Sequence, residues 1–154
     1  MIEYTKTRQG TPTPRRAHPT DAGVDLTAQA VANDAGWVGE FYEARLTSMG
    51  QTMTFGTGIA VAIPEGHVGL VFVRSSVGIK RGLVLANGTG VIDAGYRGEI
   101  VVCLQNTRDT MAVVEKGERI AQLAIVPCDL TEWREVSSLD DTDRGQGGIG
   151  STGK

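Results

Sequence analysis

The chain has 154 residues, a length that fits one domain with a single core, so a second domain is not expected. Its net charge of −3 and pI near 5.4 give no electrostatic reason for stable binding to nucleic acid or to an anionic membrane. The 21 glycines, with Val, Ile and Thr between them, favour many short strands joined by tight turns.

The first residues lack the apolar stretch of a signal peptide, and no run approaches the ~18 apolar residues of a membrane span. Cys103 and Cys128 lie in apolar runs without the spacing of metal ligands. Free thiols in a reducing compartment are therefore favoured over a disulfide. The expected location is cytoplasmic, which means the host cytoplasm if the source is viral.

Residues 21–28 (DAGVDLTA) carry two carboxylates before a short apolar run. Asp21 can cap a turn, and Asp25 can be an ordinary solvated side chain. Alternatively, Asp25 could hold the waters of a Mg²⁺ ion that is bound mainly by substrate phosphates, since Mg²⁺ keeps much of its hydration and uses few carboxylates.

Alternating apolar and polar positions predict strands, and short Gly, Pro or Lys segments predict the turns between them. Residues 30–50 are less regular, and we expect a hairpin or surface excursion there with Trp37, Phe41 and Tyr42 as apolar anchors. A short helix is expected at residues 75–80, begun by Ser75 or Ser76 as N-cap and ended by Gly82. The predicted fold is an all-β closed or sandwiched domain. The strands are expected at residues 53–63, 67–73, 99–105 and 119–126, with turns at 64–66, 88–90 and 116–117.

Polar residues at the ends of these strands are candidates for ligand binding. Arg74, Ser75 and Ser76 offer a guanidinium, two hydroxyls and free helix N–H groups, which suit an anion, although a Ser N-cap beside a surface Arg is an equal alternative. Asn87 is expected at a hairpin turn, where Asn is common because it tolerates a positive φ, and its amide could instead read the edge of a base. Gln122, taken singly, is more simply structural.

Residues 90–100 (GVIDAGYRGEI) place Asp93 and Tyr96 three residues apart on a glycine turn between two apolar runs. An acid beside an aromatic ring suits a pocket that holds a sugar or base flat while the carboxylate directs a water molecule. Neither His18 nor His67 belongs to a Ser/His/Asp or Cys/His pattern, so covalent nucleophilic catalysis is not expected.

The C-terminal segment differs in composition from the rest of the chain. Residues 138–143 are polar and acidic, and residues 144–154 are rich in glycine. Alone, such a segment should be mobile because it can bury little surface. Arg144, Ser151 and Thr152 supply donors for phosphate, so the segment could order around a polyphosphate.

In their order and spacing, five segments resemble the five motifs of the trimeric all-β dUTP pyrophosphatases (dUTPases). The resemblance runs from Arg15 to the end of the chain, and five matches in sequence are far more specific than any one of them. The segments are residues 21–28 (DAGVDLTA), 74–80 (RSSVGIK), 90–100 (GVIDAGYRGEI), 117–123 (GERIAQL) and 144–153 (RGQGGIGSTG).

The resemblance implies a jelly-roll-like fold in a homotrimer with three active sites at subunit boundaries, each built from all three chains. Residues 1–137 would form the β-domain, and residues 138–154 a flexible arm that closes a neighbour's site. The implied reaction is hydrolysis of dUTP to dUMP and pyrophosphate, with Mg²⁺ on the triphosphate. This reaction would limit uracil incorporation into DNA and supply dUMP for thymidylate synthesis.

The same resemblance assigns roles to individual residues. Asp93 would orient or deprotonate the attacking water, and Tyr96 would pack on the deoxyribose and leave no room for a 2′-hydroxyl. Asp25 would bind metal-coordinated water. Uracil would be read by Asn87 with the backbone of Val91 and Ile92, and the phosphates would be held by Arg74, Ser75, Ser76, Gln122, Arg144, Ser151 and Thr152.

Two features depart from the family pattern. Ile149 stands where the family usually has an aromatic residue over the uracil, which predicts weaker substrate binding or a less firmly closed arm. Residues 30–50 are longer than compact members need and could be a protein-partner surface.

Two alternative functions are considered. One is a dCTP deaminase-related enzyme, although no deaminase-type glutamate signature is found. The other is a regulatory protein-binding module, of viral origin or not, on the same fold.

Overall fold

The computed structural model describes residues 1–33 and 35–148. Within them the chain forms one helix and thirteen strands, and every strand pairing is antiparallel. The expected all-β class is confirmed. The strands are β1 (Glu3–Lys6), β2 (Val24–Thr27), β3 (Ala30–Asn33), β4 (Gly36–Val38), β5 (Glu43–Leu46), β6 (Thr52–Gly56), β7 (Ile59–Ala62), β8 (His67–Val73), β9 (Leu83–Leu85), β10 (Gly90–Ile92), β11 (Val101–Asn106), β12 (Ala112–Glu115) and β13 (Arg119–Pro127), and the helix is α1 (Ser75–Arg81).

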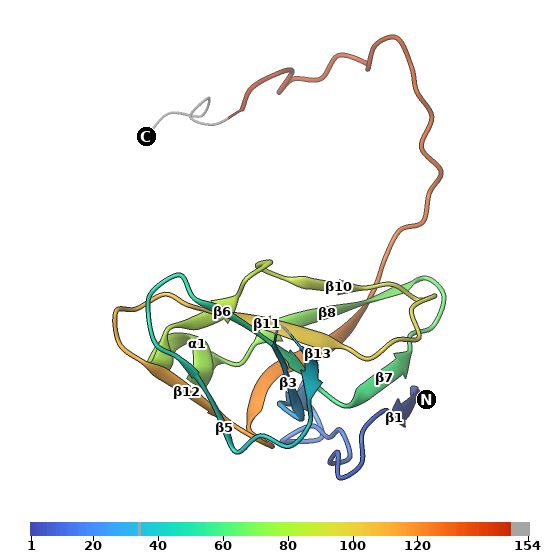
Figure 1. The fold of residues 1–154 in the computed structure, drawn as a ribbon. Coiled ribbons are helices and arrows are strands. Elements are labelled where there is room, and N and C mark those ends of the chain that lie inside the picture. Colours follow the sequence, from blue (N-terminus) through green and yellow to red (C-terminus); the bar gives the residue numbers. More distant parts are fainter. Residues whose placement is uncertain (34, 149–154) are drawn as a thin grey trace.

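Two larger sheets and two strand pairs make up the domain. One sheet has the order β10-β8-β13-β2, and the other has the order β4-β3-β6-β11-β9. The pairs are β1 with β7 and β12 with β5. Figure 1 shows these strands stacked in layers, as in a jelly roll, with α1 at one end.

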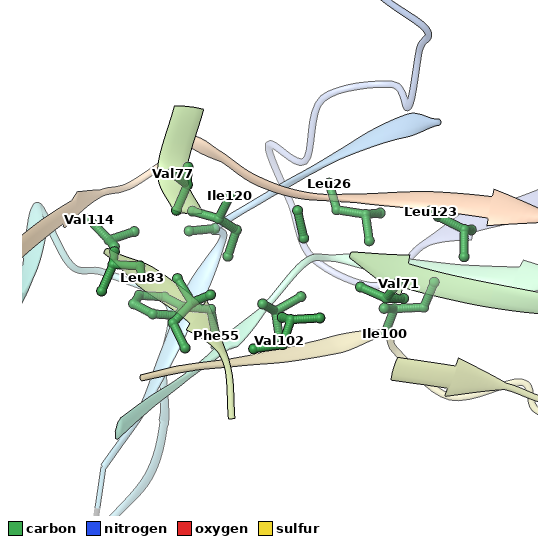
Figure 2. Close-up of a cluster of buried hydrophobic side chains, with 14 of the residues drawn as sticks. Leu26, Phe55, Val71, Val77, Leu83, Ile100, Val102, Val114, Ile120 and Leu123 are labelled. Atoms are coloured by element: carbon green, nitrogen blue, oxygen red, sulfur yellow. The ribbon is translucent and has the colours of Figure 1, made fainter. Parts of the chain in front are cut away.

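The core lies between the layers. In Figure 2, Leu26, Ile120 and Leu123 line one side of a continuous apolar band, and Phe55 and Val102 line the other. Phe55 and Leu104 have no exposed surface. Because burying a large apolar side chain contributes about 1.5 to 3 kcal/mol, this band is the main source of stability.

Residues 30–50 are more regular than expected. They hold the hairpin of β3 and β4, and then β5, which pairs with β12. Ala30, Ala44 and Leu46 are buried in the core, whereas Tyr42 is 85% exposed. The expected hairpin is present, but the expectation of an irregular excursion is wrong because alternate residues of this segment help to close the core.

Most of the strands expected from sequence are present with small shifts of their ends. The expected strand at 53–63 is instead two strands, β6 and β7, in different sheets. Gly58, between them, has a φ of 73°, a left-handed conformation that ends one strand and redirects the chain. The seven-residue helix is too short to cross a membrane, and the described residues contain no other helix.

Gly82 ends α1, as expected, and is the clearest example of a required glycine. Its φ is 68°, and a Cβ there would lie 2.6 Å from Nε of Arg108, whose guanidinium donates to the carbonyls of Ile79 and Lys80. We expect Gly82→Ala to lower the free energy of unfolding by about 1 to 3 kcal/mol through backbone strain and displacement of Arg108. Urea unfolding measures this change.

Gly39→Ala is the matched control, because Gly39 has ordinary backbone angles and open space where a Cβ would point. It should alter the free energy of unfolding by no more than about 0.5 kcal/mol. Equal losses in the two variants would contradict the strain at Gly82.

Candidate functional site

A polar cavity of about 310 Å³ lies where β2, the end of β8 and β13 meet. Four of the residues expected from sequence contribute to it or border it: Asp25, Arg74, Ser75 and Gln122. Asp25 and Gln122 are direct partners in the pairing of β2 with β13, and Arg74 follows the last residue of β8. Sheet pairing therefore brings together residues that are up to 97 positions apart in the chain.

Asp25 is held between two arginines. Its Oδ1 lies 2.9 Å from Nε of Arg74, and its Oδ2 lies 2.9 Å from a terminal guanidinium nitrogen of Arg119. Only 13% of the Asp25 side chain is exposed, and such charge-assisted contacts are strong and directional. The carboxylate therefore orients both guanidinium groups, of which that of Arg74 lines this cavity.

Arg119 was missed by the sequence reasoning. It lies in the same segment as Gln122, residues 117–123, but the position of a side chain within a motif does not reveal its ion pair. The available signal was the single arginine of a motif whose Gln122 was already assigned to phosphate binding.

The start of α1 differs from the expected N-cap. The capping position is Arg74 rather than Ser75 or Ser76, and no side chain makes the capping hydrogen bond. The Arg74 carbonyl accepts from the N–H groups of Val77 and Gly78. Ser75 and Ser76 are exposed helical residues, so their first-turn N–H groups and hydroxyls face solvent beside the cavity.

Gly23 has a role at the cavity that its sequence position did not indicate. A Cβ on Gly23 would lie 2.5 Å from Oε1 of Gln122. A glycine is therefore required for the amide of Gln122 to pass close to the backbone and line the cavity.

Asp21 lies at the same cavity, with 40% of its side chain exposed. The backbone N–H of His18 donates to its carboxylate, which lowers the pKa of Asp21 below the ordinary value of an aspartate. Asp21 thus stays ionised through the neutral range.

The second group of expected residues lies along β10. Asn87 is exposed in the turn before this strand, Val91 and Ile92 belong to it, and Asp93 follows it. The turn at Asn87 is not a hairpin, because β9 pairs with β11 and β10 pairs with β8. The positive φ belongs to Gly88, so the conformational reason for Asn at this position is wrong.

A cavity of about 410 Å³ lies beneath Asn87 and Gly90, with Val71 and Cys103 among its other residues. Both cysteines are free thiols, as expected.

Asp93 and Tyr96 share one tight turn. The Tyr96 N–H donates to the Asp93 carbonyl at 3.0 Å, and the Asp93 side chain is exposed. The Tyr96 hydroxyl donates to the Glu99 carbonyl at 2.9 Å. The phenol ring lies so close to Gly98 that a Cβ there would come within 2.4 Å of the hydroxyl. The turn therefore fixes the ring and leaves the carboxylate open to solvent.

Within one chain, Asp93 does not meet the cavity that holds Arg74. Ile92 pairs with Gly69 near the start of β8, whereas Arg74 follows the end of β8. Asp93 is thus opposite residue 68, six residues from Arg74, which corresponds to about 20 Å along the strand. The two groups face opposite ends of one sheet.

The segment after β13 extends away from the sheets in Figure 1. Residues 128–148 contain no helix or strand, and Trp133 is fully exposed. Within the described residues, the hydrogen bonds of Arg144 are local: its Nε donates to the Gly147 carbonyl, and its own carbonyl accepts from the Gly147 N–H. The other expected arm residues, Ile149, Ser151 and Thr152, lie outside the described residues.

The described residues contain no group of three or more His, Cys, Asp or Glu side chains that could hold a metal ion. An ion at the cavity would therefore need ligands from a bound phosphate chain and from water. Asp25 fits such an ion, because each of its oxygens accepts from one arginine and keeps a further lone pair for a metal-bound water.

Solved structures with the same fold include dUTPases from bacteriophages. The dUTPase of Staphylococcus bacteriophage 80alpha, solved with dUpNHpp, is 31% identical, covers 100% of this chain and 99% of its own, and has a TM-score of 0.82. A variant dUTPase from phage phi11 of S. aureus, solved with a structural Mg(II) ion, is 27% identical over 90% of this chain and 97% of its own, with a TM-score of 0.73. The fold is therefore that of an all-β protein class with members solved around a nucleotide analogue.

Sequence comparison narrows this class to one family. The dUTPase family model matches residues 10–153. The deoxyuridine 5′-triphosphate nucleotidohydrolase of Rhodococcus erythropolis is 45% identical over 92% of this chain and 79% of its own length. The chain belongs to the dUTPase family, which confirms the resemblance found in the motifs.

Proposed function

We propose that this chain hydrolyses dUTP to dUMP and pyrophosphate with Mg²⁺, limiting uracil incorporation into DNA and supplying dUMP for thymidylate synthesis. Family membership supports the reaction, because relatives carry the name of dUTP nucleotidohydrolases. The observation that carries the proposal is the division of the site: an arginine-lined anion cavity at one end of a sheet and an open carboxylate at the other.

The division implies assembly. A single chain presents Asp93 and the cavity of Arg74 about 20 Å apart, so one substrate can reach both only if they come from different chains. In the proposed homotrimer each site takes the turn of Asp93 from one β-domain (residues 1–137) and the cavity from a second. Leu130, Trp133 and Leu139, apolar and largely exposed in one chain, are surface that a neighbour would cover.

The arm, residues 138–154, would come from the third chain. Arg144 carries the only side chain of the described arm suited to bidentate phosphate contact, and it is exposed. Ser151 and Thr152 would add hydroxyl donors, and Ile149 would cover the base.

The proposed chemistry follows from these positions. Asp93 accepts a proton from water and aims the oxygen at the α-phosphorus, in line with the leaving pyrophosphate. Arg74, Ser75, Ser76 and Gln122 bind phosphate oxygens, and Asp25 holds Arg74 and Arg119 toward them. Bound Mg²⁺ would supply charge neutralisation on the triphosphate, with Asp25 as acceptor for one of its waters.

Substrate selection is assigned to β10 and to the turn that follows it. Asn87 and the backbone of Val91 and Ile92 read uracil along β10. Tyr96, held by Glu99, packs on the deoxyribose and excludes a 2′-hydroxyl. Cytoplasmic location belongs to the same proposal, since free Cys103 and Cys128 suit a reducing compartment.

The test is pyrophosphate release from dUTP, compared with dTTP, UTP and dCTP, with and without Mg²⁺. dUTP should be strongly preferred and Mg²⁺ should raise the rate. Ammonia release from dCTP would replace this proposal with the deaminase-related reading. Sedimentation at assay concentrations should give the mass of three chains.

A second candidate function rests on the exposed face of residues 36–42. Trp37 is 47% exposed and Tyr42 is 85% exposed, an aromatic pair suited to a protein partner. Deleting residues 30–50 would remove the buried Ala44 and Leu46, so the point variant Tyr42→Ser is the better probe. Loss of a pulled-down partner with dUTP hydrolysis intact would support a separate regulatory role, and retention of every partner would oppose it.

Replacing Ile149 by Phe should lower the Michaelis constant for dUTP. Stacking of an aromatic ring on a base contributes about 1 to 3 kcal/mol, which corresponds to a roughly 5- to 150-fold effect at most. Steady-state kinetics measures it, with Ile149→Leu as the control that keeps an aliphatic cover. A Michaelis constant equal in the two variants would contradict a position over the base.

A further inference from the structure

Glu99 lies half-buried behind the turn that carries Asp93 and Tyr96. Its Oε1 accepts from Nε of Arg8 at 2.7 Å and from the backbone N–H of Gly58 at 2.6 Å. The exposed fractions of the Arg8 and Glu99 side chains are 21% and 17%. The carboxylate is thus well shielded from water and satisfied by an ion pair and a backbone donor.

Bare backbone makes room for this contact. A Cβ on Gly56 would lie 2.7 Å from Oε1 of Glu99 and 3.0 Å from Nε of Arg8. Gly56 is the last residue of β6, so the Arg8–Glu99 ion pair crosses this strand where a side chain would clash with it. The close fit fixes Glu99 against the junction between β6 and β7.

The backbone around Glu99 is fixed as well. The Ile100 N–H donates to the Ile59 carbonyl at 2.8 Å, and the Ile100 carbonyl accepts from the N–H and the hydroxyl of Thr57. Both Thr57 and Ile100 are buried. The anchored carboxylate and these bonds hold the end of the turn to the β6–β7 junction.

The Glu99 carbonyl faces the other way, into the turn. It accepts the hydroxyl hydrogen bond of Tyr96 at 2.9 Å, with the phenol ring lying over Gly98. A shift of the Glu99 backbone would therefore move the acceptor that sets the position of this ring. On the far side, Arg8 stacks over Trp37 with its guanidinium carbon 4.9 Å from the ring centroid, which restricts the arginine.

We infer that Glu99 is a positioning residue for sugar selection: its carboxylate, clamped by Arg8 and Gly58, holds the carbonyl that fixes the Tyr96 ring. The inference rests on the proposed function, because it names what orients the group assigned to exclude a 2′-hydroxyl. Glu99 itself touches no substrate. Its influence is on how sharply dUTP is distinguished from UTP.

The first test is Glu99→Gln, which keeps the shape and removes the charge. We expect the ratio of kcat/KM for dUTP to that for UTP to fall by about 10-fold or more, because small misplacements at a packed site have large kinetic effects. A merely structural residue would lower both values of kcat/KM together and leave the ratio unchanged, which would overturn the inference. Glu65→Gln, at an exposed turn, is the matched control and should keep the wild-type ratio.

The second test is a double-mutant cycle with Arg8→Gln. Because Arg8 acts through the Glu99 carboxylate, the double variant should lose little more selectivity than the more affected single variant. Additive losses of selectivity in the double variant would overturn the inference that Arg8 acts through the Glu99 carboxylate. Arg8→Gln also carries the test if Glu99→Gln fails to fold, as monitored by circular dichroism at the assay temperature. A wild-type chain that fails to hydrolyse dUTP would instead refute the proposed function.

Discussion

Asp93→Asn should lower kcat for dUTP by about 10²- to 10⁴-fold with little change in the Michaelis constant. The amide keeps the size of the carboxylate but cannot take a proton from water. Asp93 is exposed, and its carbonyl bond to the Tyr96 N–H belongs to the backbone, so the turn should survive the substitution. Steady-state pyrophosphate release measures the loss.

Asp109→Asn provides the control, since Asp109 is an exposed aspartate in a loop that carries none of the proposed site residues. Its kcat should equal that of the wild type. Unchanged kcat in Asp93→Asn would refute the assignment of water activation to this carboxylate, and a raised Michaelis constant with normal kcat would reassign it to substrate binding.

Two inactive variants, Asp93→Asn and Arg74→Gln, should restore activity when their chains are mixed within trimers. Each variant alone has three defective sites. In mixed trimers a site is intact when its turn comes from an Arg74→Gln chain and its cavity from an Asp93→Asn chain. Random assembly after joint refolding should give about a quarter of the wild-type rate.

The matched control mixes Asp93→Asn with Tyr96→Ala, two changes on one turn. In the proposed trimer a site takes this turn from a single chain, so every site keeps one defect, and the mixture should show no activity beyond that of the two variants assayed alone. No recovery with Arg74→Gln, while the refolded wild type is active, would contradict a site shared between chains.

Local patterns in the sequence predicted the longest strands well. The alternation at 67–73 has the same bounds as β8, and the prediction at 119–126 differs from β13 only at Pro127. The short strands were not predicted, because three or four residues carry too little alternation. β5 and β12 exist because they pair with one another across 66 or more residues, and pairing over that separation leaves no local signal.

The candidate site shows the same limit. Motif spacing indicated Asp25, Arg74 and Gln122, and the structure gathers them at one cavity. Motif spacing could not indicate that Asp25 pairs with Arg119. Nor could it indicate that position 23 must be a glycine for the Gln122 side chain to pass close to it. Those facts depend on the register between β2 and β13, which the chain sets only on folding.

The opposed ends of β8 have a consequence for how activity begins. In the proposed homotrimer, a newly made chain would carry both halves of a site without joining them, and it would consume no nucleotide until it met other copies. The rate should then rise more steeply than in proportion to chain concentration when the protein is dilute. Hydrolysis would then be a measure of completed assembly, and a damaged chain that folds but cannot associate would be inactive.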